Sequence, residues 1–434
     1  MSEEPLYNTS HPSTLLESGT FKGDSIGLDV STIQPLLNRT GLFIAHRRKE
    51  LIKPPVSFND DVDAWLEEQK FGRKPEVVVI KVVEVDGGRV PRNGRREARL
   101  LAKSIYPTIV PLLNAYLDPP TPSSPNSKIS LFMPHYPYTL RALLDQPSFV
   151  PNLDDEDDEM FTHFAHSIAN DLHSATSHIH SLGIYHRDIN PSNVLISEEG
   201  KVVLGDFGIA VEKGDEKKGE QHFEVGTGPY RAPELVFASK SYDERAIDLW
   251  ALGTTIAEMF RPFDSKIFDS LSPSDSDDND EDSDDYDEKE GEDSPKPKRL
   301  RKVYREGEEP RRKSLFESGS SDFVLAASIF RVLGTPTLET WPEAKDLPNF
   351  GRFQFVNHAP NSLRLYLPHL GPDDDGLLEI IESLLVISAG GRSTSTDEKM
   401  KEISIDMIGG SFRDRFEDYL DEVMLGIERE QDFY

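Results

Sequence analysis

Residues 186–193 read HRDINPSN, and Asp206-Phe207-Gly208 follows at the end of a predicted strand. The first stretch carries Asp188 and Asn193 on one predicted loop, directly after a long helix with an apolar face. Mg²⁺ prefers oxygen ligands and usually bridges substrate phosphates, so two carboxylates and an amide suit a phosphoryl-transfer site. Asp188, Asn193 and Asp206 therefore predict such a site.

Two further charged pairs are expected. Lys81 projects from VVVIKVVEV at 77–85, a run rich in Val and Ile. An unpaired charge in apolar surroundings is costly, so Lys81 needs a partner, and Glu97 on the following predicted helix can supply one. Glu234 ends the sequence APE, and Arg392 far downstream is its expected partner.

Hydrophobic periodicity divides the chain into two parts. The predicted strands are residues 77–85, 127–133 and 201–208, and the predicted helices are residues 95–104, 160–183 and 246–260. Strands dominate before about residue 135 and helices after it. The pattern predicts an α+β protein with a small β-rich lobe followed by a larger α-helical lobe.

Composition excludes several classes. The 434 residues are 36% hydrophobic, enough for one large two-lobed domain, and the net charge of −30 argues against nucleic-acid binding. Without cysteine there is no disulfide, thiolate metal site or cysteine nucleophile. No stretch approaches the ~18 apolar residues of a membrane helix, and MSEEPLYNTS lacks the features of a secretory signal. We expect a soluble intracellular protein without a nucleic-acid or membrane partner.

The acidic charge is concentrated in one segment. Residues 275–293 carry a net −12, which leaves about −18 for the rest of the chain. Dense charge with few apolar residues does not form a core, so we interpret residues 264–313 as a disordered insertion. PKPKRLRK at 295–302 is typical of a nuclear import signal, or neutralises the acidic run beside it. The acidic cluster at 154–159 is interpreted as a solvated loop.

Taken together, these motifs resemble the eukaryotic protein kinases over roughly residues 35–400. The ordered series VVIK, a helix Glu, HRDxxxxN, DFG, APE and DLWALG, which contains Asp248, is present at kinase-like spacing. The resemblance implies that Lys81, held by Glu97, contacts the ATP phosphates and that Asp188 is the catalytic base. It implies that Asn193 and Asp206 bind Mg²⁺. It also makes Thr227 a positioner of Asp188.

The resemblance also implies nucleotide-binding and structural residues. Pro134 and Tyr136, after the strand at 127–133, are expected in the hinge that holds ATP, and Gly41 is the only glycine near its covering loop. Arg187, Glu234, Asp248 and Arg392 are expected to be structural. The implied units are a tail (1–30), the N-lobe (31–136), the first part of the C-lobe (137–263), the insertion (264–313), the second part of the C-lobe (314–400) and a C-terminal helical extension (401–434).

Some features narrow the family. Arg231 before APE, and LGTPTLETWPEAKDLPNF at 333–350, are similar to the cyclin-dependent kinases (CDKs). The segment RVPRNGRREARLLAKS lacks the PSTAIRE-like sequence by which CDKs contact cyclin, so a cyclin partner is not expected. PLLNRT at 35–40 replaces the glycine-rich loop, which weakens the expected approach to phosphate. Asn190 stands where Ser/Thr kinases usually have a catalytic Lys, which should slow the chemical step.

The activation segment is unusual as well. Between Asp206 and Glu234 the only hydroxyl side chains are those of Thr227 and Tyr230, and His222 aligns with the activating Thr of CDKs. Arg187 normally pairs with a phosphate in this segment. Here Glu216, Glu220 and Glu224 are nearby carboxylates, which indicates a kinase that needs no activation-loop phosphorylation.

This combination resembles the fungal monomeric CDK-activating kinases, chiefly through EVGTGPYRAPEL at 224–235. The implied protein is a monomeric Ser/Thr kinase using Mg²⁺-ATP, with a CDK as protein substrate, in nucleus and cytoplasm. Two alternatives remain open. One is a pseudokinase scaffold. The other is a cyclin-bound kinase for Ser/Thr-Pro sites, which Gly226 disfavours because CDKs have a Val there.

Overall fold

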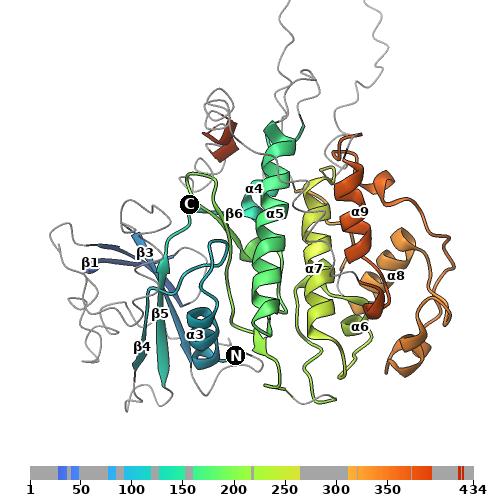
Figure 1. Ribbon diagram of the computed structural model, residues 1–434, viewed down its shortest axis with the longest axis horizontal. Helices are drawn as coiled ribbons and strands as arrows, with labels where there is room; N and C mark the ends of the chain where they lie inside the picture. The colour runs from blue at the N-terminus through green and yellow to red at the C-terminus, as the bar shows by residue number, and fades with distance from the viewer. Residues whose placement is uncertain are drawn as a thin grey trace, which may run out of the picture.

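The computed structural model describes residues 28–36, 41–47, 77–84, 92–118, 127–151, 160–216, 219–263, 311–319, 321–372, 374–392, 419–421 and 423–424. Two lobes lie side by side, with the strands of the first lobe (blue to cyan) beside a helical second lobe (Figure 1). This is the two-lobed α+β arrangement that the sequence predicts.

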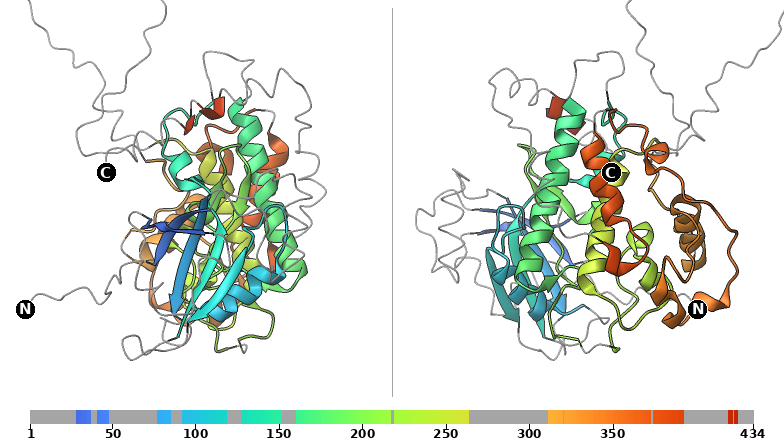
Figure 2. Two further views of the ribbon diagram at one scale, coloured as in Figure 1. Left: turned by 90° about the vertical axis from the view of Figure 1, so that its left-hand side faces the viewer. Right: turned by 45° about the vertical axis from the view of Figure 1, so that its right-hand side comes forward.

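The first lobe is built on a five-stranded antiparallel sheet of order β1-β2-β3-β5-β4. Figure 2 (left) shows its strands in front of the second lobe. Their bounds are Leu28–Pro35 (β1), Leu42–Arg47 (β2), Val77–Glu84 (β3), Asn114–Asp118 (β4) and Lys128–Pro134 (β5). The strands predicted at 77–85 and 127–133 are confirmed. β1 begins inside the range 1–30 predicted as a tail, so its first three residues belong to the sheet.

One helix, α3 (Gly94–Lys103), packs on this sheet. It begins at Asn93, whose side chain accepts a hydrogen bond from the backbone N–H of Arg96 at 2.9 Å. Gly94 permits close contact with β5, because a Cβ there would lie 2.5 Å from Cγ2 of Ile129. The cap and the glycine therefore position Glu97, one turn into the helix, over the sheet.

The second lobe is mostly helical. Its helices are α4 (Leu140–Leu144), α5 (Met160–Ser181), α6 (Pro233–Val236), α7 (Glu244–Met259), α8 (Asp322–Leu333) and α9 (Asp375–Leu384). α7 lies between α5 and α9 (Figure 1) and contacts both. They share one large apolar core, which explains the helical periodicity predicted at 160–183 and 246–260.

Short strands flank the two loops that contain the predicted site residues. β6 (Tyr138–Thr139), β8 (Val194–Ile196) and β9 (Val202–Leu204) form one small sheet, and β7 (Ile184–Tyr185) pairs with β10 (Val211–Glu212). Residues 186–193 span the connection from β7 to β8, and Asp206 follows β9 by two residues. The two motifs that dominate the sequence are therefore brought to adjacent loops.

The ends of the predicted insertion meet at one place. Phe263 and Arg312 form an antiparallel bridge, and the N–H of Lys313 donates to the carbonyl of Pro262 at 3.2 Å. Arg312 is 3% exposed and donates to the carbonyls of Met259 and Arg261 at 2.8 Å each. The sequence analysis placed Arg312 in the insertion. This is a correction, because its guanidinium satisfies buried carbonyls of the second lobe.

Residues 264–310 and the acidic cluster at 154–159 lie outside the described residues. In the predicted C-terminal extension, Leu420, Val423 and Met424 are buried in the core of the second lobe. This part of the extension therefore packs on the lobe. Within the described residues, no helix combines the length and apolar character needed to cross a membrane.

Candidate active site

The loop between β7 and β8 is held by one buried carboxylate. Asp248 on α7 is fully buried and accepts backbone hydrogen bonds from His186 at 2.8 Å and Arg187 at 2.7 Å. His180 contacts the same carboxylate at 2.9 Å. Arg187 has a φ of 66°, a left-handed conformation that costs energy for a residue with a side chain. The bonds to Asp248 therefore stabilise a strained backbone immediately before Asp188.

Three side chains converge on Asp188. The hydroxyl of Thr227 donates to Oδ1 at 2.6 Å, Nδ2 of Asn190 donates to Oδ1 at 3.1 Å, and Nδ2 of Asn193 donates to Oδ2 at 3.1 Å. Burial raises the pKa of Asp188 above its usual value, although the bond from Thr227 works in the opposite direction. A carboxylate that is oriented and made more basic in this way suits general-base catalysis.

Asn190 has a second set of contacts. Its Oδ1 accepts from the backbone N–H of Ser192 at 2.9 Å, capping the short 3-10 helix Pro191–Asn193, and its Nδ2 also donates to the Asp188 carbonyl at 3.0 Å. It therefore orients the loop and Asp188, but brings no positive charge to the position where the kinase resemblance implies Lys.

Lys81, Glu97 and Asp206 form one charged group beneath the sheet. The Lys81 ammonium lies 2.6 Å from Oε1 of Glu97 and 2.7 Å from Oδ1 of Asp206. Burial lowers the pKa of Lys81, but these two carboxylates outweigh it and hold the pKa above its usual value. The contact expected between Lys81 and Glu97 is present. It joins β3 to α3, and Asp206 joins both elements to the loop after β9.

His186 is a linking residue that the sequence analysis did not single out. Its Nε2 lies 2.9 Å from the carbonyl of Gly205, and its ring packs edge-on against Phe207 with centroids 4.9 Å apart. Asp206 next to them has a φ of 55°. His186 therefore couples the loop of Asp188 to the loop of Asp206. The sequence signal that could have identified His186 is its position two residues before Asp188 in HRDINPSN.

The donor set is suited to a magnesium ion with phosphate. Oδ1 of Asn193 and the carboxylate of Asp206 are hard oxygen donors on adjacent loops, and Nδ2 of Asn193 is already used by Asp188. No cluster of three or more His, Cys, Asp or Glu side chains that could hold a metal occurs among the described residues. Two protein ligands that leave room for phosphate oxygens fit Mg²⁺, which seldom uses an all-protein cage. Bound there, Mg²⁺ would neutralise phosphate charge.

The predicted nucleotide-binding residues occupy the edge between the lobes. Pro134 ends β5, and the N–H of His135 donates to the carbonyl of Val77 at 3.2 Å. Tyr136 is 8% exposed and packs in a core cluster with Met133 and Phe207. Gly41 has a φ of 78°, and a Cβ there would lie 3.0 Å from the Val82 carbonyl. Residues 37–40 lie outside the described part of the chain.

Arg187 pairs with one of the three candidate carboxylates. Its Nη1 donates to Glu216 at 2.8 Å and to the Tyr242 hydroxyl at 3.5 Å, and its Nε donates to the Ile209 carbonyl at 2.9 Å. The Arg187 side chain is fully buried and that of Glu216 is 12% exposed. A charge-assisted hydrogen bond of this kind is among the stronger ones in proteins.

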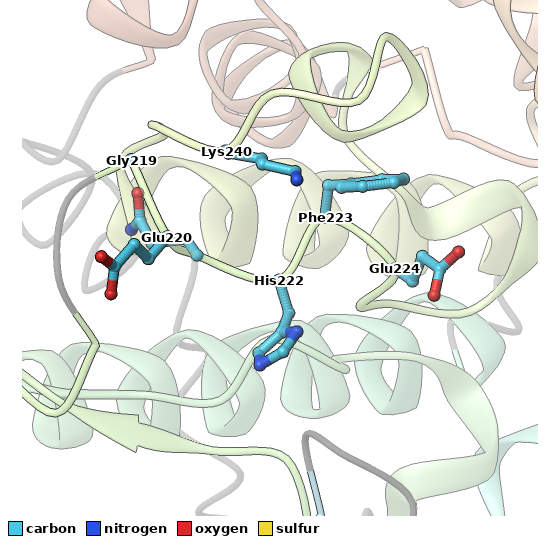
Figure 3. Close-up of a pocket in the computed structure, with 7 residues that line it drawn as sticks. Gly219, Glu220, His222, Phe223, Glu224 and Lys240 are labelled. Atoms are coloured by element: carbon cyan, nitrogen blue, oxygen red, sulfur yellow. The ribbon is translucent and has the colours of Figure 1, made fainter.

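Glu220 and Glu224 instead line an open pocket of about 350 Å³ formed by residues 219–224 and Lys240. Figure 3 shows these two carboxylates at opposite ends of the pocket, and His222 pointing away from Lys240. The pocket-lining backbone at His222 is fixed, because the Tyr242 hydroxyl donates to the His222 carbonyl at 2.6 Å. Gln221 also donates to the Tyr242 carbonyl at 3.1 Å. The activation segment is thus anchored at His222, the aligned position, and at the residue before it.

Glu234 and Arg392 form the predicted pair. Nη1 and Nη2 of Arg392 bind the two carboxylate oxygens at 2.6 and 2.8 Å, and the guanidinium lies 5.1 Å from the Trp250 ring centroid. The sequence analysis missed a second buried carboxylate, Glu258. Glu258 accepts from Arg141 at 2.8 Å and from the Tyr230 hydroxyl at 2.5 Å. Both pairs fasten the segment after Thr227 to the second lobe.

A lysine–glutamate pair joins strand and helix, three donors hold a carboxylate base, and two oxygen donors lie on the loop of that base and on the next loop. This arrangement defines a phosphoryl-transferring enzyme. The protein kinase domain family matches residues 70–348, so this chain belongs to the protein kinase family. It is a CDK-like serine/threonine protein kinase. Protein kinase domains in general use ATP and Mg²⁺.

Relatives and a solved structure support this assignment. The chain is 26% identical to cyclin-dependent kinase 7 of Xenopus laevis over 72% of this chain and 68% of that protein. It is 26% identical to serine/threonine-protein kinase csk1 of Schizosaccharomyces pombe over 79% of this chain and 90% of that protein. The crystal structure of the yeast RNA Pol II CTD kinase CTDK-1 complex matches with a TM-score of 0.55 at 18% identity, covering 86% and 92% of the two chains, which shows the shared fold.

Proposed function

We propose that this kinase transfers the γ-phosphate of ATP to the activation-loop Thr of a CDK, as a monomer that requires neither cyclin nor its own activation-loop phosphorylation. Asp188 accepts the proton of the substrate hydroxyl, Lys81 holds the ATP phosphates, and Asn193 and Asp206 ligate Mg²⁺. Thr227 and Asn190 orient Asp188. The substrate class rests on the resemblance of EVGTGPYRAPEL at 224–235 to the monomeric CDK-activating kinases.

The observation that carries the regulatory part of the proposal is the bond between Arg187 and Glu216. Arg187 precedes the catalytic base and is fully buried, so it needs an anion. Glu216 supplies that anion at 2.8 Å without any modification. The role that a phosphate has in related kinases is thereby taken by an encoded carboxylate.

The test of the substrate is radiolabel transfer from Mg-ATP by protein produced in bacteria and never phosphorylated. A catalytically inactive CDK and a generic basic protein serve as acceptors, with Asp188→Asn as the blank. We expect label only on the activation-loop Thr of the CDK. Label on the generic protein alone would establish a kinase with another substrate. No transfer above the blank would favour the pseudokinase scaffold.

Glu216→Ala tests the phosphate-free activation. Removing the carboxylate leaves the Arg187 charge buried without its anion, and loss of such a bond is worth about 10-fold to 100-fold when it is expressed in turnover. We therefore expect kcat/KM of the unphosphorylated enzyme to fall by at least 10-fold, and Glu216→Gln to be intermediate because it can still accept a hydrogen bond.

The matched control is Glu220→Ala, since Glu220 is exposed and lines the pocket instead of meeting Arg187. It is expected to stay within about 2-fold of the unmodified enzyme, as surface substitutions usually do. Equal losses in the two Ala variants would contradict the specific role of Glu216. So would wild-type protein that becomes active only after treatment with a second kinase.

A second candidate function is a cyclin-bound kinase for Ser/Thr-Pro sites. The residue type at Gly226 disfavours it, whereas the backbone conformation at this position favours it. The φ of Gly226 is 80°, and Nε of Arg231 donates to the preceding Val225 carbonyl at 3.2 Å. A carbonyl engaged in this way is not offered to a substrate N–H, and proline lacks that N–H. A peptide array in which activity strictly requires Pro after the acceptor, together with stimulation by cyclin, would replace the first proposal by this one.

A further inference from the structure

Arg92 lies directly before the N-cap of α3 and reaches Asp206. Its Nη2 is 3.8 Å from Oδ2 of Asp206, and its side chain is 49% exposed. Its Nη1 lies 3.0 Å from the position that a Cβ on Gly208 would occupy. The absence of a side chain at Gly208 therefore makes room for this guanidinium beside the carboxylate.

The backbone holds Arg92 in this place. The N–H of Asn93 donates to the carbonyl of Gly208 at 3.3 Å, while the Asn93 side chain caps α3. The start of the helix is thus bonded to the segment that contains Asp206. Arg92 is therefore positioned by two independent contacts of its neighbour, whereas its own side chain is half-exposed.

The charges around Asp206 explain why the position of Arg92 matters. Burial raises the pKa of Asp206, but Lys81 and Arg92 outweigh it and hold the pKa below its usual range. Lys81 contacts Oδ1 and Arg92 faces Oδ2, and within the described residues no other Lys or Arg lies within 4.0 Å of this carboxylate. Asn190 is neutral where the kinase resemblance implies a Lys that contacts the transferred phosphate. Arg92 is thus a second cation at Asp206, in a site where Asn190 brings no charge.

We propose that Arg92 supplies to the terminal phosphate of ATP the positive charge that Asn190 does not provide. When Asp206 accepts a metal ion, the attraction between Arg92 and this carboxylate is reduced, and the half-exposed guanidinium donates to phosphate oxygens. A planar guanidinium is well suited to phosphate, and fixed positive charge near the transferred group is the largest contribution to phosphoryl transfer. This inference rests on the kinase activity and not on the identity of the protein substrate.

Nucleotide binding tests the proposal without turnover. The dissociation constants of Mg-ATP and Mg-ADP are measured by calorimetry for the full-length protein and for Arg92→Ala. We expect ATP binding to weaken by about 10-fold and ADP binding by less than about 2-fold, since only ATP carries the terminal phosphate. The control Arg95→Ala, an exposed Arg in the first turn of the same helix, is expected to change neither constant. Equal weakening for ATP and ADP, or no weakening, would overturn the proposal.

A rescue experiment tests whether the missing charge is the one supplied. With whichever acceptor protein the wild-type enzyme labels, Arg92→Ala is expected to lower kcat by about 10-fold or more, and Arg92→Lys to lose less. Asn190→Lys in the Arg92→Ala background is expected to recover most of that loss. If Asn190→Lys alone is active but does not rescue Arg92→Ala, the charge-replacement proposal is wrong. If Asn190→Lys alone is inactive, the ATP–ADP comparison decides.

Discussion

Asp188→Asn is expected to reduce phosphoryl transfer by a factor of about 10²–10⁴, the range that loss of a positioned general base produces. The side chain keeps its size, and one oxygen can still accept the bond from Thr227 at 2.6 Å, so the loop should keep its shape. Nucleotide affinity should change little, because Lys81 and Asp206 bind each other without Asp188. The measurement is single-turnover label transfer combined with a nucleotide dissociation constant.

The matched control for this variant is Ser192→Ala. Ser192 lies on the same loop, and its backbone N–H, not its hydroxyl, makes the capping bond to Asn190. The activity of the Ser192→Ala variant should remain within about 3-fold of wild type, because substitutions outside the main contacts usually have small effects. If Asp188→Asn were as active as Ser192→Ala, Asp188 would not be the base. If both variants lost ATP binding, the loss would report a disrupted loop.

The largest effect on stability is expected from Glu234→Ala. This removes the carboxylate that binds two nitrogens of Arg392 at 2.6 and 2.8 Å and leaves a guanidinium whose residue is 5% exposed. Breaking a buried pair by deleting one partner costs about 3–5 kcal/mol, because the remaining charge is not compensated. We expect the free energy of unfolding, measured by urea titration, to fall by about that amount.

Two comparisons separate the charge effect from general damage. Glu234→Leu combined with Arg392→Met should lose much less than either single substitution, since an apolar pair can replace a buried ion pair at little cost. Glu317→Ala removes an exposed pair with Arg331 at 2.9 Å and should cost about 0–1 kcal/mol. Additive losses in the double variant would show that packing around Trp250, not the buried charge, dominates the effect.

The sequence was sufficient for the lobes and for most of the site. Strand β3 was predictable because a β-branched run of strand length favours a strand, and helix α3 because apolar residues at three- and four-residue spacing favour a helix. Lys81 and Glu97 could be paired in advance, because a charge in an apolar strand requires a counter-ion. The short connection from Asp188 to Asn193 placed both on one loop by chain length alone.

The boundaries of segments and the contacts between distant segments were harder to predict from the sequence. Arg312 was interpreted as part of a charged insertion because its neighbours in sequence are polar and basic. In the folded protein it is buried, donating to the carbonyls of Met259 and Arg261 at the end of α7 and to the carbonyl of Leu144 at the end of α4. Burial of a single Arg depends on acceptors far away in the chain, and no local sequence pattern predicts them.

By itself, the sequence determined the fold class, the order of the motifs and the residues proposed for phosphoryl transfer, because these depend on residue type and local spacing. Only the tertiary structure decided which carboxylate meets Arg187 and which cation joins Lys81 at Asp206. The sequence alone does not distinguish Glu216, Glu220 and Glu224. In the structure, only Glu216 of these three contacts Arg187, while the other two line the nearby pocket. Arg92 reaches Asp206 because a backbone bond from Asn93 to Gly208 brings α3 against the loop after β9. Arg187 and Glu216 are 29 residues apart, and Arg92 and Asp206 are more than a hundred residues apart. Packing between segments decides such contacts, because electrostatic interactions depend on distance in space and not on separation along the chain.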